Sequence, residues 1–139
     1  MRDVNLPIRK AYIAALAAIG CPVYYQVVPD SVLIDVYAVI ERISNNDAST
    51  MNSSDVTATV QLTVFTHSAS YNTGVVCDTK AGLIMTALKP TPQYQITADG
   101  VQVVSTKLQS DNTNNYTINN TRNYVDRTLV FQHHIFINS

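Results

Sequence analysis

The sequence predicts an α+β fold in which a mostly antiparallel sheet of about five strands carries two helices on one face. Three observations predict this fold. An amphipathic helical pattern opens the chain, a long alternating strand is followed by a helical run that stops at a proline, and a second long alternating strand lies near the C-terminus. The predicted order is α-β-β-β-α-β-β, and 139 residues suit a single domain spanning 1–139.

The first part of the chain predicts a helix and two strands. Residues 4–19 have helical spacing, with one apolar stripe formed by Ile8, Tyr12, Ala15, Leu16 and Ile19. Gly20 and Pro22 then end the helix. Two β-branched and aromatic runs, at 23–28 and 36–43, predict the first two strands.

The middle of the chain predicts a half-buried strand and a second helix. The strand begins near Asp55, and one of its faces is apolar: Val56, Ala58, Val60, Leu62 and Val64. The helix covers residues 71–88 and is stopped by Pro90 and Pro92. We expect its sheet-facing side chains to be Val75 or Val76, Thr79, Leu83, Met85 or Thr86, and Ala87 or Leu88.

The last part predicts two strands, at 101–108 and 124–137, the second long enough to form a hairpin arm with the first. One face of the final strand carries Leu129, Phe131, His133, Ile135 and Ile137; the other carries Val130, Gln132, His134 and Phe136. The polar runs 44–54 and 109–123 are interpreted as loops. A loop as long as 109–123 is usually functional or disordered.

Composition limits the classes of function. Charged residues make up 14% of the chain, below the roughly 25% of typical domains, which is compatible with subunit contacts or with a compositional bias of the genome. A net charge of −1 gives no electrostatic footprint for nucleic acid. No segment is apolar enough to span a bilayer, and the N-terminus is better interpreted as an amphipathic helix than as a signal peptide, so we expect a protein made in the cytoplasm.

The sequence holds no cluster of residues suited to chemistry, so an enzyme, a metal site and a cofactor are not predicted. His133 and His134 are neighbours on a strand and point to opposite faces, so they do not readily share one ion. Neither a GxSxG nor a phosphate-binding glycine motif is present, and the carboxylates are scattered. Cys21 and Cys77 show no metal or redox spacing; two free thiols are favoured, and a disulfide stays open.

A charged cluster beside the long polar run is the best candidate for a contact surface. Arg122, Asp126 and Arg127 suit an intersubunit ion pair at an interface rim, and equally an ordinary solvated strand. With the neighbouring polar side chains, the candidate interface residues are Asn112, Asn114, Asn115, Tyr116, Asn119, Asn120, Arg122, Asp126 and Arg127.

The succession of segments is the chain's most specific signal. IRKAYIAALAAIG leads into CPVYYQVVP, then come VYAVIERI, VQLTVFTH, GVVCDTKAGLIMTAL and, after a polar run, DRTLVFQHHIFI. This pattern resembles the tail terminator or tail-completion family of tailed bacteriophages, small proteins at the head–tail junction, over nearly the whole chain. The third of these strands lacks the tryptophan of the family pattern, and the insert 109–123 is longer.

The resemblance implies a structural virion protein that forms a homo-oligomeric ring, hexameric or dodecameric, and contacts portal, neck and tail proteins. Such a ring needs head-to-tail contacts that close, for which 44–54 and 109–123 are candidates. Near-neutral charge would suit a channel through which DNA passes without specific binding. The alternative is a small non-catalytic protein-binding adaptor module; an uncharacterised enzyme with a site assembled from scattered Asp and His is a third, less favoured possibility.

Overall fold

The computed structural model describes residues 3–25, 36–47, 49, 54–68, 73–89, 96–98, 100–118 and 122–137. The elements are α1 (Asn5–Ala18), β1 (Val23–Tyr25), β2 (Val36–Asp47), β3 (Asp55–Ser68), α2 (Thr73–Leu88), β4 (Val101–Ile118) and β5 (Arg122–Ile137). The strands form one sheet in the order β1-β2-β3-β5-β4. β1 pairs with β2 in parallel and every other pair is antiparallel, which confirms the predicted α+β fold and element order.

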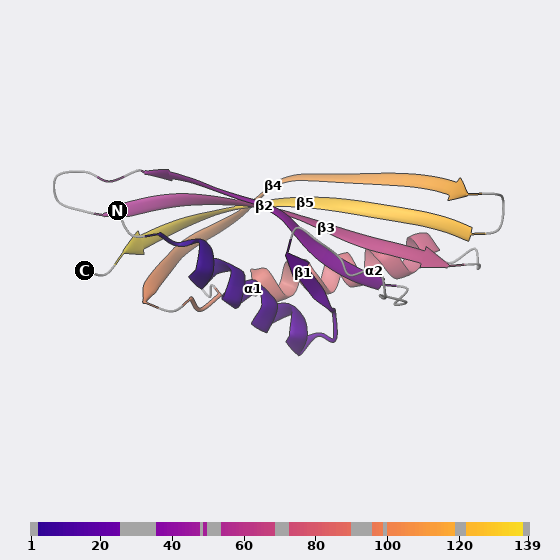
Figure 1. Cartoon of the computed structure of the whole chain (residues 1–139), viewed down its shortest axis with the longest axis horizontal. Helices are drawn as coiled ribbons and strands as arrows, with labels where there is room; N and C mark the ends of the chain where they lie inside the picture. The colour runs from indigo at the N-terminus through magenta and orange to yellow at the C-terminus, as the bar shows by residue number, and fades with distance from the viewer. Residues whose placement is uncertain are drawn as a thin grey trace.

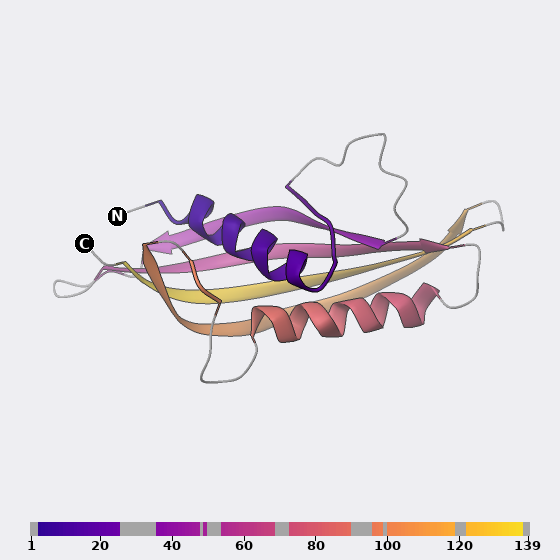
Figure 2. The ribbon, with the colours of Figure 1, turned by 90° about the horizontal axis from the view of Figure 1, so that it is seen from below.

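Two layers make up the molecule (Figures 1 and 2). Both helices lie on the same face of a strongly twisted sheet, with α1 on the side of β1 and β2 and α2 along β3 and β5. No helix of the described residues covers the other face, which we call the helix-free face. It carries Thr57, Thr59, Gln61 and Thr63 of β3 and Thr128, Val130, Gln132 and His134 of β5.

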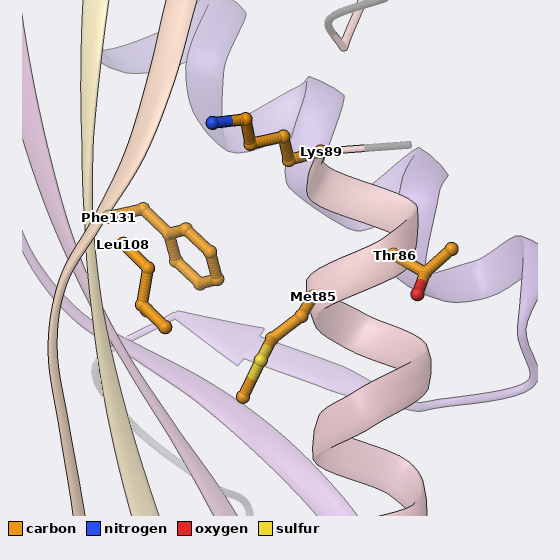
Figure 3. Close-up of a pocket in the computed structure, with 5 residues that line it drawn as sticks. All are labelled: Met85, Thr86, Lys89, Leu108 and Phe131. Atoms are coloured by element: carbon orange, nitrogen blue, oxygen red, sulfur yellow. The ribbon is translucent and has the colours of Figure 1, made fainter. Parts of the chain in front are cut away.

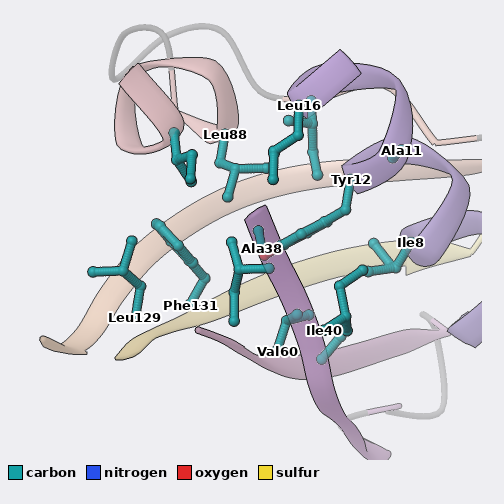
Figure 4. Close-up of a cluster of buried hydrophobic side chains, with 14 of the residues drawn as sticks. Ile8, Ala11, Tyr12, Leu16, Ala38, Ile40, Val60, Leu88, Leu129 and Phe131 are labelled. Atoms are coloured by element: carbon teal, nitrogen blue, oxygen red, sulfur yellow. The ribbon is translucent and has the colours of Figure 1, made fainter. Parts of the chain in front are cut away.

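The core lies between the sheet and the helices and follows the alternation of the two central strands (Figure 4). The apolar residues predicted to face inward on β3 are all fully buried, and those of β5 are at most 7% exposed, so both face assignments are confirmed. From α1, Ile8, Tyr12 and Leu16 are fully buried, also as predicted. Complete burial of one Leu or Ile side chain contributes roughly 1.5–3 kcal/mol, so these stripes hold the two layers together.

The second helix is rotated relative to the prediction. Its buried positions are Cys77, Ala81, Ile84 and Leu88, whereas the exposed side chains include Val75, Val76 and Leu83. The prediction was therefore wrong for Val75, Val76, Thr79 and Leu83, whereas Leu88 is buried and Met85 is partly buried and packs against the core, as predicted. The physical reason is that α2 carries apolar residues on most of its surface, so helical periodicity does not single out one face. The buried face of α2 thus combines two small side chains, Cys77 and Ala81, with Ile84 and Leu88.

Both runs predicted as polar loops are partly strand. Residues 44–47 continue β2, residues 109–118 continue β4, and residues 122–123 begin β5. The loop assignments 44–54 and 109–123 were wrong at these positions because residues 111–115 are exposed and therefore show no hydrophobic alternation, although their backbone pairs with β5. Residues 48, 50–53 and 119–121 lie outside the described residues.

The β4–β5 hairpin does not extend beyond the sheet as a free arm. β3 pairs with β5 over its whole length, from Asp55 opposite Phe136 to Ser68 opposite Asn123. β4 is the outer strand, and it contains two bulges, between Val103 and Ser105 and between Leu108 and Ser110. The hairpin is thus part of the sheet, and β4 forms its edge.

Candidate functional site

The candidate interface residues lie along the outer half of the β4–β5 hairpin. Asn112 pairs with Thr128 and Asn114 with Asp126, and both asparagine side chains are exposed. Asn115, also exposed, is opposite Val125. The structure therefore places a row of exposed amide side chains on an edge strand, where they are available to a neighbouring molecule.

The remaining members of the predicted set fall into two groups. Tyr116 and Arg122 occupy paired positions at the end of the hairpin, opposite Tyr124 and Ile118. Asn119 and Asn120 lie outside the described residues. Backbone pairing brings the described members of the set together on one hairpin, as expected for residues that are close in sequence.

Arg127 has partners within the chain. Its Nε donates to Asp111 Oδ1 at 2.8 Å and its Nη2 to Asp111 Oδ2 at 2.6 Å, a bidentate pair between neighbouring strands. Its Nη1 donates to Asp78 Oδ1 of α2 at 3.0 Å. Only 18% of the Arg127 side chain is exposed. This guanidinium therefore ties helix α2 to the outer strand, on the helix side of the sheet, in addition to any role at an interface.

The ion cluster shifts the protonation of its members. The hydrogen bonds from Arg127 lower the pKa of Asp111, and partial burial opposes that effect. The same bonds raise the pKa of Arg127 above its already high value. Both groups therefore stay charged at neutral pH, and the charges cancel locally.

His133 is the one histidine of the described core, and it is fully buried. Its Nε2 lies 2.5 Å from Tyr12 Oη of α1, and its Nδ1 lies 2.9 Å from Thr106 Oγ1 of β4. Burial lowers the pKa of His133 to about 4 and raises that of Tyr12. The imidazole is consequently neutral at pH 7, with one ring nitrogen donating and the other accepting, which satisfies a polar group in an apolar layer.

The helix-free face carries a second polar network. Glu41 accepts hydrogen bonds from Gln61 Nε2 at 3.1 Å and from the hydroxyl of Thr63, and Thr63 also lies 3.1 Å from Thr128 Oγ1. Beside it, the Tyr37 ring stacks on Phe65 with centroids 5.4 Å apart. Hydroxyl, amide and aromatic side chains thus lie together on this face.

The histidines and cysteines that the structure describes lie in separate surroundings. His133 is buried against α1, whereas His134 Nε2 lies 3.6 Å from Asp55 Oδ2, so the two imidazoles point to opposite faces as predicted. Within the described ranges no three potential ligands gather around a common point. Cys21 and Cys77 are both free thiols, as favoured, and burial raises the pKa of each. Neither α1 nor α2, over the described chain, has the length and apolarity needed to cross a membrane.

The sequence did not reveal the hydrogen-bonding partners of Arg127 and His133, because these partners lie elsewhere in the chain. Asp111 and Asp78 were counted among scattered carboxylates, and Tyr12 was assigned to the apolar stripe without a polar role. Asp111 had a local signal, since a hairpin places it near Arg127. The contact of Tyr12 with His133, separated by 121 positions, had none.

The fold has a known counterpart. A chain from the virion of a native gene transfer agent particle superposes with a TM-score of 0.71 at 19% sequence identity, covering 98% of this chain and 99% of that chain. No protein-family model and no curated protein matches the sequence. The likeness establishes a shared fold over nearly the whole length of both chains.

Proposed function

We propose that this protein is a structural subunit of a phage-like virion, and that it forms a ring at the head–tail junction as a tail terminator, tail-completion or neck component. The observation that carries the proposal is the end-to-end fold likeness to a virion chain, with almost nothing left over in either protein. A chain that shares its fold with a particle component over 98% of its residues is best explained as a component of a particle. The element order that resembles tail terminator proteins supports the finer assignment.

The surface is consistent with assembly. The described polar clusters either hold the fold together, as Arg127 with Asp111 does, or lie on sheet surface where Asn and Thr side chains are exposed or half-buried. We propose that Asn112, Asn114, Asn115, Tyr116, Asn119, Asn120, Arg122, Asp126 and Arg127 form or border a contact with a neighbouring subunit or with a portal, neck or tail protein. A chain with net charge −1 also suits a channel that passes DNA without retaining it.

The decisive experiment locates the protein in particles. Purified particles from the source should contain the chain in a fixed, low copy number, and labelling should place it at one site between head and tail. Disruption of its gene should leave filled heads and tails that fail to join, or tails of irregular length. Particles of normal morphology and infectivity without the chain would contradict the proposal.

Imaging of the isolated protein tests the ring. Negative-stain images and light scattering should reveal closed rings of six or twelve copies, formed alone or upon addition of the adjoining neck protein. A protein that stays monomeric in both conditions and binds a host protein instead would favour the adaptor alternative.

A further inference from the structure

The helix layer has an apolar hollow on one side. It lies between α2 and the outer strand β4, has a volume of about 230 Å³ and is lined by Met85, Thr86, Lys89, Leu108 and Phe131. Phe131 is almost fully buried at its base, whereas the Leu108 side chain is 38% exposed. Figure 3 shows Met85, Leu108 and Phe131 directed toward the same gap, with Lys89 at one end of it. This α2–β4 hollow is therefore an apolar site with a cation at its rim.

The size and charge of the α2–β4 hollow define what can occupy it. A cavity of roughly 150 Å³ lined by Leu, Ile and Phe side chains admits benzene, which is bulkier than the side chain of leucine. The flexible thioether of Met85 also adapts readily to an inserted group. Among the described residues, the ammonium group of Lys89 has no carboxylate partner. The matching occupant is an aliphatic side chain with a carboxylate beside it.

Charge separates the candidates among the exposed apolar side chains of this chain. Other than Leu108, the large ones among the described residues are Leu6, Ile13, Val75, Val76, Leu83 and Val104. Lysine or arginine lies within about one helical turn of Ile13, Val76 and Leu83, and a lysine also follows Val104 on β4. Val75 has Asp78 three residues after it, but that carboxylate already binds Arg127. Leu6 remains, with Asp3 three residues before it.

Leu6 and Asp3 lie together at the start of α1. The Leu6 side chain is 47% exposed. Asp3 Oδ1 accepts a hydrogen bond from the backbone N–H of Asn5 at 2.9 Å, which holds the carboxylate at the N-terminal end of the helix, next to Leu6. No cationic side chain of the described residues contacts Asp3. The start of α1 therefore presents the combination of groups that the α2–β4 hollow requires.

The start of α1 and the α2–β4 hollow lie on opposite sides of the subunit. Asn45 Nδ2 of β2 donates to Asn5 Oδ1 at 2.5 Å, which fixes the start of α1 to the β2 side. β3 and β5 separate β2 from β4, a distance of roughly 14 Å at three strand spacings. Figure 2 shows the same arrangement, with α1 starting beside β2 and α2 running along β4. Leu6 therefore cannot reach the hollow of its own copy, and its contact with a second copy would be head-to-tail, the type from which rings close.

We propose that copies of this protein join through the helix layer, with Leu6 of one copy inserted into the α2–β4 hollow of the next and Asp3 paired with Lys89. This inference rests on the proposed ring and adds the side chains that join adjacent subunits. The inserted leucine contributes most of the affinity, because an exposed ion pair is weak. The contact lies between side chains and needs no backbone pairing between strands of adjacent copies.

Substitution of Leu6 tests the insertion. Leu6→Lys brings a cation to the apolar hollow beside Lys89 and should weaken self-association by roughly tenfold or more, measured by sedimentation under the conditions in which the wild type forms rings. Ile13→Lys adds the same charge to the same helix at a residue of similar exposure, 43%, and should leave the rings intact. Circular dichroism checks that both variants fold. Rings that persist in Leu6→Lys, equal weakening by both variants, or a wild type that stays monomeric both alone and with the adjoining neck protein would overturn this contact.

Exchange of the two charges tests the pairing of Asp3 with Lys89. Asp3→Lys and Lys89→Asp should each weaken self-association by roughly two- to tenfold, because each variant brings two like charges together. The double variant Asp3→Lys/Lys89→Asp should recover most of the wild-type affinity. Asp3→Lys/Lys107→Asp, which reverses a lysine on the other face of the sheet, should show no recovery. A double variant at residues 3 and 89 that binds no more tightly than its single parents would overturn the ion pair.

Cross-linking locates the contact directly. In Leu6→Cys/Thr86→Cys, a short bifunctional maleimide should join adjacent copies into a ladder that ends at the size of the ring. Leu6→Cys/Thr79→Cys, roughly two turns away along the same surface of α2, should be cross-linked less, and the native Cys21 and Cys77 are buried. A stronger ladder with Thr79→Cys than with Thr86→Cys would overturn the contact and leave the virion function standing; absence of the chain from particles would instead remove the proposed function itself.

Discussion

At the scale of single residues, His133 is the most constrained polar group of the described core. It lies in the row of side chains that β5 directs toward the helices, and both ring nitrogens have a hydroxyl within hydrogen-bonding distance. Because Tyr12 belongs to α1 and Thr106 to β4, the imidazole links the helix layer to the outer strand through the middle of the core. A neutral ring does this at little cost, whereas a charged ring would have to be desolvated.

The buried imidazole predicts a loss of stability in mild acid. Its pKa is about 4 in the folded protein against 6.5 for the free side chain, so the unfolded chain binds the proton more readily. The stabilisation is complete above pH 6.5 and is lost as the pH falls toward 4, by about 2–3 kcal/mol, after which this loss levels off. Urea unfolding at pH 7 and pH 4.5 measures the difference.

Two variants separate the contribution of His133 to the pH dependence of stability from that of the other titratable side chains. His133→Leu should be less stable at pH 7, because it leaves the hydroxyls of Tyr12 and Thr106 without their partner, yet it should lose about 2–3 kcal/mol less than wild type on acidification. Tyr12→Phe should lower stability at both pH values and keep the wild-type pH dependence. Equal pH dependence in wild type and His133→Leu would contradict the assignment.

At the scale of elements, α2 shows how a helix with apolar residues around most of its surface selects one face. The buried residues of α2 are Cys77, Ala81, Ile84 and Leu88. Two of them, Cys77 and Ala81, have small side chains, which lets the helix pack close to the sheet. The ion pair from Asp78 to Arg127, next to this face, fixes the same rotation. The larger valines and Leu83 consequently remain at the surface.

This rotation predicts that substitutions at residues 81 and 83 differ in their effect on the stability of the fold. Ala81→Leu adds volume against the sheet and should destabilise the fold by about 1–3 kcal/mol. Leu83→Ala removes an exposed side chain and should change stability by less than about 0.5 kcal/mol. Chemical denaturation of both variants is sufficient, and a larger cost for Leu83→Ala than for Ala81→Leu would show that the helix presents the other face.

At the scale of the whole molecule, low charge and a hydrogen-bonded surface are the dominant properties. The chain carries 14% charged residues, and the charged cluster around Arg127 combines one guanidinium with the carboxylates of Asp111 and Asp78, which leaves a net charge of only −1. A surface of amides and hydroxyls is easier to desolvate than a charged one, which suits extended contact between subunits.

The same property predicts weak binding of DNA. With nine Lys and Arg against ten Asp and Glu, few phosphates can be neutralised at once, so affinity for duplex DNA should be negligible near 150 mM salt. Fluorescence anisotropy with a labelled duplex, on the assembled protein, measures this affinity. Tight binding at that salt concentration would be incompatible with a channel through which DNA slides freely.

The faces of the strands could be predicted from the sequence because side-chain direction alternates strictly along a strand. Once Val60 is inside, so are Ala58 and Leu62. The same rule failed for residues 111–115, since an edge-strand segment in which every residue is exposed shows no hydrophobic alternation. The candidate site was anticipated only as far as the hairpin brings sequence neighbours together.

The sequence by itself thus determined the α+β class, the order of elements and the inward faces of α1, β3 and β5, all of which follow from local periodicity. Tertiary structure alone decided the rotation of α2, the partners of Arg127 and the burial of His133 between Tyr12 and Thr106. These features depend on contacts between distant parts of the chain, which packing and strand order create and local pattern does not encode.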